Sequence, residues 1–341
     1  METYTIRDIA RLSGVSVSTV SRVLNGRPDV GEETRKKVED IISQVHFVRN
    51  ASAISLKASL PGVVPVIFRG RQNPFYHRLS ECLMSDPLSS ALPLVTDVID
   101  EEADEFKRAW DISREKHALA ICLAGSGADD TDQILPGLSC PVLFLTTSTD
   151  GTSLQHLPSV SMDDEGDTCR AMHALLDMGH RNIAIFGKSD HPMDTMARRM
   201  NGIRTAYLER SLDPSRIFHV PCRFSPKDAF HAARQFFAQH PDVSLAFCLS
   251  DTMVLGVRRA LHDLGISVPH QVSLIGMDGL EMDDYMIPSL TTIEQPLVQL
   301  SSHALTLLRR MVAGETCEGE HILVPGCMRW RESVSKPFCS T

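Results

Sequence analysis

The chain has 341 residues, 43% of them hydrophobic and 23% charged, with a net charge of −9. This composition is typical of folded globular proteins, and the length suits two or three domains of about 100–200 residues each. No stretch of the sequence approaches the ~20 consecutive apolar residues that a bilayer-spanning segment needs, and no secretion signal is recognisable.

The nine cysteines form no Cys-x-x-Cys pair. Their odd number and spacing argue against a disulfide framework and against a zinc site. We interpret them as buried apolar thiols and expect a cytoplasmic protein, associated with the nucleoid if it binds DNA, with no cofactor or metal.

The negative charge is unevenly distributed. Residues 1–60 carry nine Lys and Arg against seven Asp and Glu, whereas the rest of the chain carries 25 against 36. A mildly positive head on an acidic body suits a protein whose head alone contacts phosphate groups.

Residues 5–26 predict two short helices around a tight turn. Thr5 and Asp8 match a capping box, and Gly14 is a natural left-handed helix stop. Ser16 is expected to cap the second helix. The residues expected to face inward are Ile6, Ile9, Ala10, Leu12 and Ser13 in the first helix and Val20, Val23 and Leu24 in the second.

The outward face of the second helix lacks the Glu and Lys residues of an ordinary exposed helix. It consists of Val17, Ser18, Thr19, Ser21 and Arg22. These are mostly weak helix formers that can lie flat against phosphates and base edges, and an arginine can bond guanine with two hydrogen bonds. A plain helical hairpin would explain the two helices but not this choice of residues, so a helix-turn-helix is favoured.

The run from Ile6 to Asn25 resembles the N-terminal signature of the lactose-repressor (LacI/GalR) family of bacterial transcription regulators. The resemblance implies that Val17, Ser18 and Arg22 read bases. It also implies phosphate contacts by a second group, which comprises Ser16, Thr19, Ser21, Asn25 and Thr34, with Thr5 at the start of the head. A third helix is expected from Glu32 to about Val45, with Gly31 as a weak cap.

The segment 48–60 is small, helix-compatible and too short to be stable alone. It is either a passive linker or, by the resemblance, a hinge helix that orders on DNA. In that case Leu56 is the minor-groove wedge, Ala53 lies beside it and Asn50 contacts the backbone. We therefore divide the chain into a DNA-binding head (1–47), a hinge (48–60) and an effector-binding and dimerisation domain (61–341).

From residue 63 onward, short apolar runs alternate with amphipathic stretches. Such runs predict buried parallel strands joined by helices. Seven runs are too many for one simple unit, so we expect an α/β domain of two lobes, each a doubly wound parallel sheet, similar to periplasmic binding proteins. The runs are 63–68, 92–95, 119–124, 142–145, 183–186, 245–249 and 273–277.

The same family resemblance extends through this part of the chain. It is carried by Asn73-Pro-Phe75, Leu176-x-x-Gly179-His180-Arg181, Arg199-x-x-Gly202, Leu264–Pro269, Gly276-Met-Asp278 and Pro288-x-Leu-Thr-Thr292. In open α/β sheets ligands bind beyond the carboxyl ends of the strands, which here means between the lobes.

Asp278 directly follows a predicted strand and can accept hydrogen bonds from adjacent sugar hydroxyls, or alternatively cap the next helix. By the resemblance Arg199 clamps the ligand, whereas the adjacent Arg198 is expected to be solvated. Ser250 stands where the family has Asn, which argues against a simple hexose pocket. The effector-binding candidates are Arg69, Asn73, Phe75, Arg199, Phe224, Ser250 and Asp278.

Two side observations leave the chemistry of the ligand open. Arg69, Arg71 and Arg199 are cations that favour an anionic ligand such as a sugar acid or sugar phosphate. Phe75 and Phe224 match positions where aromatic rings stack on sugars, although core packing explains them equally well.

Catalysis finds no support. Ser126 lacks the spacing of a nucleophile elbow, Gly125-Ser-Gly127 lacks the third glycine of a dinucleotide loop, and His180 is interpreted as structural. We expect a dimeric repressor of carbohydrate-utilisation genes that binds a DNA operator under the control of a sugar-like effector. The alternatives are a nucleobase-responsive corepressor system and a solute-binding α/β protein that does not bind DNA.

Overall fold

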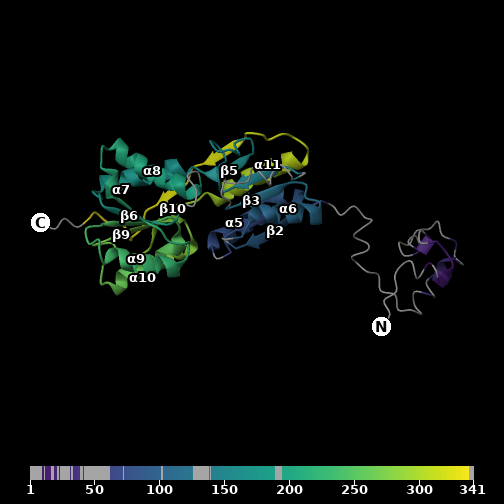
Figure 1. Cartoon of the computed structure of the whole chain (residues 1–341), viewed down its shortest axis with the longest axis horizontal. Coiled ribbons are helices and arrows are strands. Elements are labelled where there is room, and N and C mark those ends of the chain that lie inside the picture. The colour runs from purple at the N-terminus through teal and green to yellow at the C-terminus, as the bar shows by residue number, and fades with distance from the viewer. Residues whose placement is uncertain are drawn as a thin grey trace. The chain divides into compact units, whose positions relative to one another are not determined.

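A computed structural model describes residues 10, 12–16, 19–20, 23, 31, 34–38, 41, 62–71, 73–100, 103–125, 138, 140–188 and 194–337. The chain forms two compact units, residues 1–60 and 61–341 (Figure 1). Among the described residues, no helix is both long enough and apolar enough to cross a membrane.

The described part of the small unit confirms the turn between the two expected helices. Gly14 has a φ of +64°, and the backbone N–H of Thr19 donates to Ser16 Oγ at 3.1 Å, as a helix cap does. Val20 and Val23 are buried as expected. The expectation for Leu12 is wrong, because its side chain is 46% exposed while Ser13 beside it is fully buried.

Of the expected DNA contacts, Ser16, Thr19 and Thr34 lie among the described residues. Ser16 is exposed, and Thr19 and Thr34 are half-buried on helical segments. The backbone N–H of Arg35 donates to the carbonyl of Gly31 at 3.0 Å, consistent with a helix that begins at Gly31. The remaining contacts lie outside the described residues, namely Thr5, Val17, Ser18, Ser21, Arg22, Asn25, Asn50, Ala53 and Leu56.

The first lobe of the large unit is built on a parallel six-stranded sheet in the order β11-β5-β4-β3-β1-β2. Its strands are β1 (Val64–Arg69), β2 (Leu94–Ile99), β3 (Ile121–Ala124), β4 (Val142–Leu145), β5 (Ser159–Met162) and β11 (His321–Val324).

Helices cover both faces of this sheet. α5 (Pro74–Ser85) and α11 (Leu297–Val312) pack on one face, and α6 (Glu105–Lys116) packs on the other. The alternation of strand side chains explains this arrangement: Phe68 of β1 joins the core under α5, while its neighbour Ile67 joins the core under α6. A short 3-10 helix, η1 (Pro87–Ala91), follows α5.

The second lobe repeats the arrangement with the sheet β12-β10-β9-β8-β6-β7, in which only β12 is antiparallel to its neighbour. Its strands are β6 (Ile183–Phe186), β7 (Ile217–Val220), β8 (Leu245–Cys248), β9 (Ser273–Asp278), β10 (Thr291–Glu294) and β12 (Cys327–Arg329).

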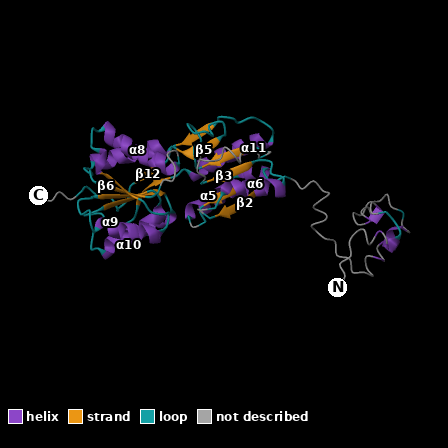
Figure 2. Cartoon of the chain, viewed as in Figure 1, coloured by secondary structure: helices purple, strands orange, loops and turns teal. Residues whose placement is uncertain are grey.

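α7 (Asp164–Asp177) and α8 (Thr195–Glu209) cover one face of the second sheet, and α9 (Pro226–Phe237) and α10 (Asp251–Asp263) cover the other (Figure 2). The 3-10 helices η3 (Pro214–Arg216) and η4 (Glu281–Tyr285) lie in its loops. The expected two-lobed α/β architecture is confirmed.

Each of the seven apolar runs overlaps a strand, although the run 92–95 includes only the first two residues of β2. Five of the twelve strands in the described residues were not expected. β5 alternates serine with apolar residues and β10 has Ile293 as its one apolar residue, while β7, β11 and β12 lie at sheet edges. Edge and polar-interrupted strands lack the continuous apolar run that marks a buried parallel strand.

The chain crosses between the lobes three times: from β5 to α7, from β10 to α11 and from β11 to β12. The crossings lie against one another at Gly326. A Cβ placed there would meet Met162 Sδ at 2.8 Å and the Glu294 carbonyl at 3.0 Å, one atom from each of the other two crossings. Sequence reasoning did not identify these crossings.

Candidate functional site

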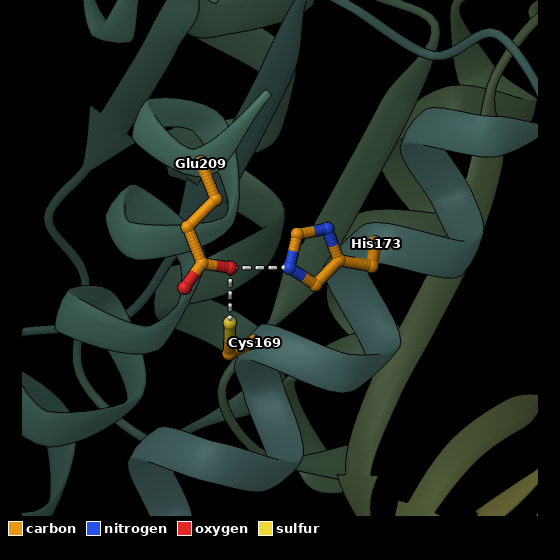
Figure 3. A group of neighbouring side chains, drawn as sticks. All are labelled: Cys169, His173 and Glu209. Carbon is orange, nitrogen blue, oxygen red and sulfur yellow. Dashed lines mark hydrogen bonds and ion pairs between the residues drawn. The ribbon is translucent and has the colours of Figure 1, made fainter. Parts of the chain in front are cut away.

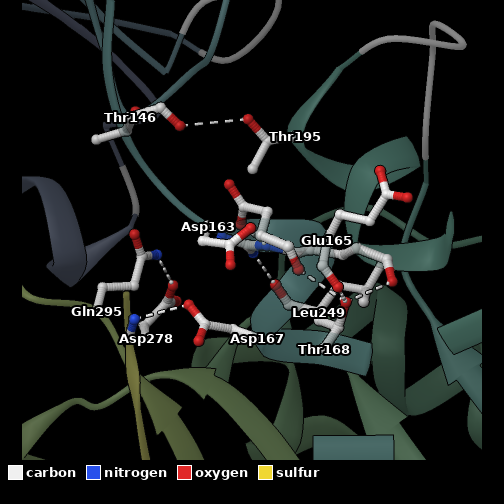
Figure 4. A network of polar contacts seen from close by, with 12 residues as sticks. Thr146, Asp163, Glu165, Asp167, Thr168, Thr195, Leu249, Asp278 and Gln295 are labelled. Carbon is white, nitrogen blue, oxygen red and sulfur yellow. Dashed lines mark hydrogen bonds and ion pairs between the residues drawn. The ribbon is translucent and has the colours of Figure 1, made fainter. Parts of the chain in front are cut away.

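Polar side chains from three neighbouring strands of the second sheet meet at their carboxyl ends. Asp278 ends β9, Ser250 follows β8 and Gln295 follows β10. Ser250 Oγ donates to Asp278 Oδ2 at 2.7 Å, and Gln295 Nε2 donates to Asp278 Oδ1 at 2.8 Å (Figure 4). Asp278 is only 4% exposed. This carboxylate is therefore held at the place where open α/β sheets bind ligands.

The local backbone around Asp278 depends on a second buried carboxylate. Asp251 accepts hydrogen bonds from the backbone N–H groups of Gly279 and Leu280, at 2.7 and 3.1 Å, and from Thr292 Oγ1 at 2.8 Å. Gly276 leaves the space for it, since a Cβ there would lie 2.0 Å from Asp251 Oδ1. The Gly276-Met-Asp278 motif thus positions one aspartate by making room for another.

Arg199 lies on α8 and is 4% exposed. Its Nε donates to Asp164 Oδ1 and its Nη1 to the Leu249 carbonyl, both at 2.7 Å. Asp164 begins α7, and Leu249 directly follows β8. We call the residues Asp164, Arg199, Ser250, Asp278 and Gln295 the strand-end cluster.

Burial governs ionisation in the strand-end cluster. It raises the pKa of Asp278 to about 7, helped by the charge of Asp251 and opposed by the charge of Arg199 and the hydrogen bond from Ser250. Burial likewise raises the pKa of Asp164 to about 6, because desolvation outweighs the attraction of the Arg199 guanidinium. The cluster therefore contains carboxyl groups that change protonation near neutral pH.

Tyr76 of α5 also belongs to this region, and sequence reasoning missed it. Burial and the charge of Asp278 raise its pKa to about 12, while the charges of Arg199 and Arg69 lower it. Its hydroxyl lies so close to Gly125 that a Cβ there would meet Oη at 2.3 Å. Its ring packs beside Phe68 and Phe75 against the first-lobe core, and no sequence pattern distinguished it from a core residue.

The three other candidates serve the local fold. Asn73 caps α5, accepting from the Phe75 N–H at 3.0 Å. Phe75 is 2% exposed and belongs to the first-lobe core, so of the two roles expected for it the structure shows core packing. Phe224 is half-buried and packs against both cores of the second lobe.

The arginines expected to attract an anion have partners within the protein. Arg69 Nη1 lies 3.3 Å from Glu105 Oε1, and Arg71 Nη2 donates to the Val98 carbonyl at 3.4 Å. Arg199 is paired with Asp164. The paired carboxylates offset two of these three charges, whereas the carbonyl partner of Arg71 leaves its charge uncompensated. The anionic ligand therefore stays a prediction with less electrostatic support.

Contacts between the lobes lie close to the cluster. Arg78 of α5 donates to the Gly279 carbonyl at 2.9 Å. Thr195 at the start of α8 donates to the Thr146 carbonyl at 3.4 Å (Figure 4). Arg198 was expected to be solvated, and this is wrong: it is half-buried and donates to the Asp150 carbonyl at 2.5 Å, because α8 lies against the loop after β4.

His180 has the structural role expected from the sequence. Its Nδ1 and Nε2 lie 2.9 Å from Ser244 Oγ and the Ser335 carbonyl, and burial lowers its pKa. Ser126 lies outside the described residues.

Comparison with known proteins assigns both parts of the chain. Residues 5–50 match the model for bacterial regulatory proteins of the lacI family, and residues 172–334 match the periplasmic binding protein-like domain. The HTH-type transcriptional regulator MalR of Clostridium butyricum is 27% identical over 94% of this chain and 96% of its own. The catabolite control protein A of Priestia megaterium is 28% identical over 97% of this chain and 99% of its own.

Among solved structures, the transcriptional regulator CelR in complex with cellobiose is similar with a TM-score of 0.71. It is 25% identical, and the match covers 97% of this chain and 99% of that one. The head signature, the two-lobed α/β fold and these similarities over nearly the whole chain agree: the chain has a head of the lacI family of bacterial regulatory proteins followed by a periplasmic binding protein-like domain, and its relatives include transcriptional regulators.

Proposed function

We propose that this protein is a transcriptional repressor of carbohydrate-utilisation genes that binds a DNA operator as a homodimer. A sugar or sugar derivative bound between the lobes controls its operator affinity. One small head cannot supply the ~10⁻⁸–10⁻¹¹ M affinity of specific regulators, which is why two copies are needed. The head carries the DNA contacts named from the sequence.

The strand-end cluster is the observation that carries the effector assignment. Each Asp278 carboxylate oxygen can accept a further hydrogen bond from a ligand hydroxyl. Arg199 and Gln295 also carry N–H groups beyond those that they donate to Asp164, the Leu249 carbonyl and Asp278, and these can donate to a ligand. This mixture of buried acceptors and donors suits a neutral polyhydroxylated ligand. The similarity to a regulator in complex with cellobiose supports the same class of ligand.

A ligand screen tests this assignment. The full chain is heated with neutral mono- and disaccharides, sugar acids, sugar phosphates and purines in parallel, and we expect a neutral sugar to raise the melting temperature. A response to purines alone would contradict the carbohydrate assignment and favour the nucleobase-responsive alternative. A response to a sugar acid alone would favour the assignment of an anionic ligand.

The variant Asp278→Ala then tests the site. It removes the acceptor for the ligand and leaves Ser250 and Gln295 without their partner. We expect the thermal response to the sugar to disappear while operator binding in a gel-shift titration stays intact. The wild-type titration with and without the sugar gives the sign of the response. If Asp278→Ala still responds to the sugar, the ligand binds at a site that does not depend on Asp278.

A further inference from the structure

Three metal-binding side chains meet on the outer side of α7 and α8. Cys169 and His173 lie four residues apart on α7, so both point to the same side of the helix, and Glu209 is the last residue of α8 (Figure 3). Cys169 Sγ lies 3.9 Å from Glu209 Oε2, and His173 Nε2 lies 2.6 Å from the same oxygen. All three donor atoms lie within 4.8 Å of one another.

This group is separate from the strand-end cluster. Glu209 follows Arg199 by ten residues, which is about 15 Å along a helix. The side chains of His173 and Glu209 are 26% and 57% exposed, and Cys169 is half-buried. Solvent therefore reaches the group, and neither the effector assignment nor DNA binding uses it.

We propose that Cys169, His173 and Glu209 bind a zinc ion that joins α7 to α8. Thiolate, imidazole and carboxylate are the ligand types that zinc takes in proteins, whereas magnesium and calcium prefer oxygen ligands alone. One thiolate and one carboxylate together neutralise the charge of Zn²⁺. Water takes the fourth tetrahedral position from the solvent side.

The geometry needs only side-chain adjustment. Bond lengths of about 2.0–2.3 Å place tetrahedral ligand atoms roughly 3.3–3.6 Å apart. The Sγ–Oε2 distance of 3.9 Å must shorten slightly, and the Nε2–Oε2 distance of 2.6 Å must lengthen. Glu209 is the most exposed of the three and ends its helix, so its side chain can make both changes. On binding, the Cys169 thiol releases its proton to solvent.

The hydrogen bond from Arg210 to His173 favours the ring tautomer that cannot bind a metal through Nε2. Its Nε donates to His173 Nδ1 at 3.2 Å, and its Nη atoms are held by the carboxylate of Asp177. A zinc ion on Nε2 requires the imidazole proton to sit on Nδ1, where Arg210 Nε can no longer donate. Zinc binding therefore turns Arg210 Nε away from the ring. A glutamine at this position would instead accept from the Nδ1–H and hold the ring for the metal.

Metal binding to the full chain tests the proposal. The protein is stripped with a chelator, titrated with zinc by calorimetry, and titrated separately with cobalt(II), whose bond to a thiolate gives an ultraviolet charge-transfer band. We expect one equivalent of zinc, and a cobalt band that disappears in Cys169→Ser. Cys169→Ser and His173→Asn should each bind zinc at least about tenfold more weakly. Arg210→Gln should bind it more tightly than the wild type.

Matched controls separate this group from other cysteines and histidines. Cys327 is an exposed free cysteine on β12, and His262 is an 85% exposed histidine on α10. Cys327→Ser and His262→Asn should leave zinc affinity and the cobalt band unchanged. The metal-free melting temperature of each variant shows whether it folds, and zinc should raise that of the wild type but not that of Cys169→Ser.

The proposal is overturned if the stripped wild type binds no zinc, or if folded Cys169→Ser and His173→Asn bind it as the wild type does. It is also overturned if the cobalt band is lost in Cys327→Ser and kept in Cys169→Ser.

Discussion

Asp278, Asp164 and Asp283 are carboxyl groups that lose most of their contact with water on folding, so the folded protein disfavours their charged forms. Burial is the largest cause of the raised pKa of each, which is about 7 for Asp278 and about 6 for the other two. Such perturbed groups gather where a protein prepares polar atoms for a ligand.

These shifts predict a pH dependence of stability. The ordinary pKa of an aspartate, 3.8, applies in the unfolded chain, so between about pH 4 and pH 7 the folded state holds protons that the unfolded state has released. The contribution of these groups to the free energy of unfolding therefore falls as pH rises through this range, by up to about 1.4 kcal/mol per pH unit for each group. Urea unfolding at several pH values measures the slope.

The variant Asp278→Asn should flatten this slope, because an amide does not titrate. Glu318→Gln, which changes an exposed carboxyl group after α11, is the matched control and should leave the slope unchanged. An unchanged slope in Asp278→Asn would show that Asp278 does not titrate in this range.

In the head, a single side chain is expected to account for much of the base reading. We predict that Arg22→Ala weakens binding to the cognate operator by about 1–3 kcal/mol and relaxes one base position in each half-site. Lys36→Ala, outside the second helix, should have a smaller effect that does not depend on sequence. Gel-shift titrations measure the ratio of the affinities for cognate and scrambled duplexes. An unchanged ratio in Arg22→Ala would refute the assignment of the second helix as the one that reads bases.

At the scale of elements, glycine decides how closely the helices of the second lobe pack. Gly202 of α8 lies directly on α7, where a Cβ would stand 2.1 Å from the Glu165 carbonyl and from Thr168 Oγ1. Gly256 of α10 meets α9 in the same way, with the Pro226 carbonyl at 1.9 Å. The Arg199-x-x-Gly202 motif therefore combines an arginine of the strand-end cluster with the close helix contact that positions it.

We predict that Gly202→Ala destabilises the protein. The added methyl group meets backbone atoms that cannot move independently, so α7 and α8 must separate, and overpacking of this kind costs about 1–3 kcal/mol or more. Arg204→Ala, at an exposed position of the same helix, is the control and should stay within about 0.5 kcal/mol of the wild type. Chemical denaturation of both variants measures the difference, and equal stabilities would contradict the close contact.

At the scale of the whole large unit, three chain crossings and a few polar contacts hold the two lobes together. Asp167 accepts from the Gly326 N–H at 2.7 Å, which ties the first crossing to the third. Arg78 reaches from the first lobe to the Gly279 carbonyl, directly after Asp278. A ligand at the strand-end cluster would therefore act at the place where the lobes contact each other.

The contact of Arg78 predicts a change in the lobe arrangement. Arg78→Ala removes a charged donor from the Gly279 carbonyl, and a hydrogen bond to a charged group contributes about 1.5–3 kcal/mol. We expect the population to shift toward more open lobes, with a larger radius of gyration in small-angle X-ray scattering. His77→Ala, at the exposed neighbouring position of α5, should leave the radius unchanged. Identical scattering from Arg78→Ala would show that this contact does not hold the lobes together.

The sequence by itself determined what depends on local pattern. Gly14 and Ser16 specify a turn and a cap through the backbone next to them, and seven continuous apolar runs predicted strands because buried parallel strands exclude water on both faces. Asp278 was found because it follows such a run directly. The DNA contacts and the domain boundaries remain predictions from the sequence.

Only the tertiary structure decided what depends on residues far apart in the chain. The three crossings, the pairing of Arg199 with Asp164, and the place of Tyr76 beside Asp278 and Arg199 join segments separated by tens to hundreds of residues. The same is true of Glu209 beside Cys169 and His173, a group that a search for Cys-x-x-Cys spacing cannot find. Local pattern specifies the elements, whereas the packing of sheets and helices selects which of their side chains meet.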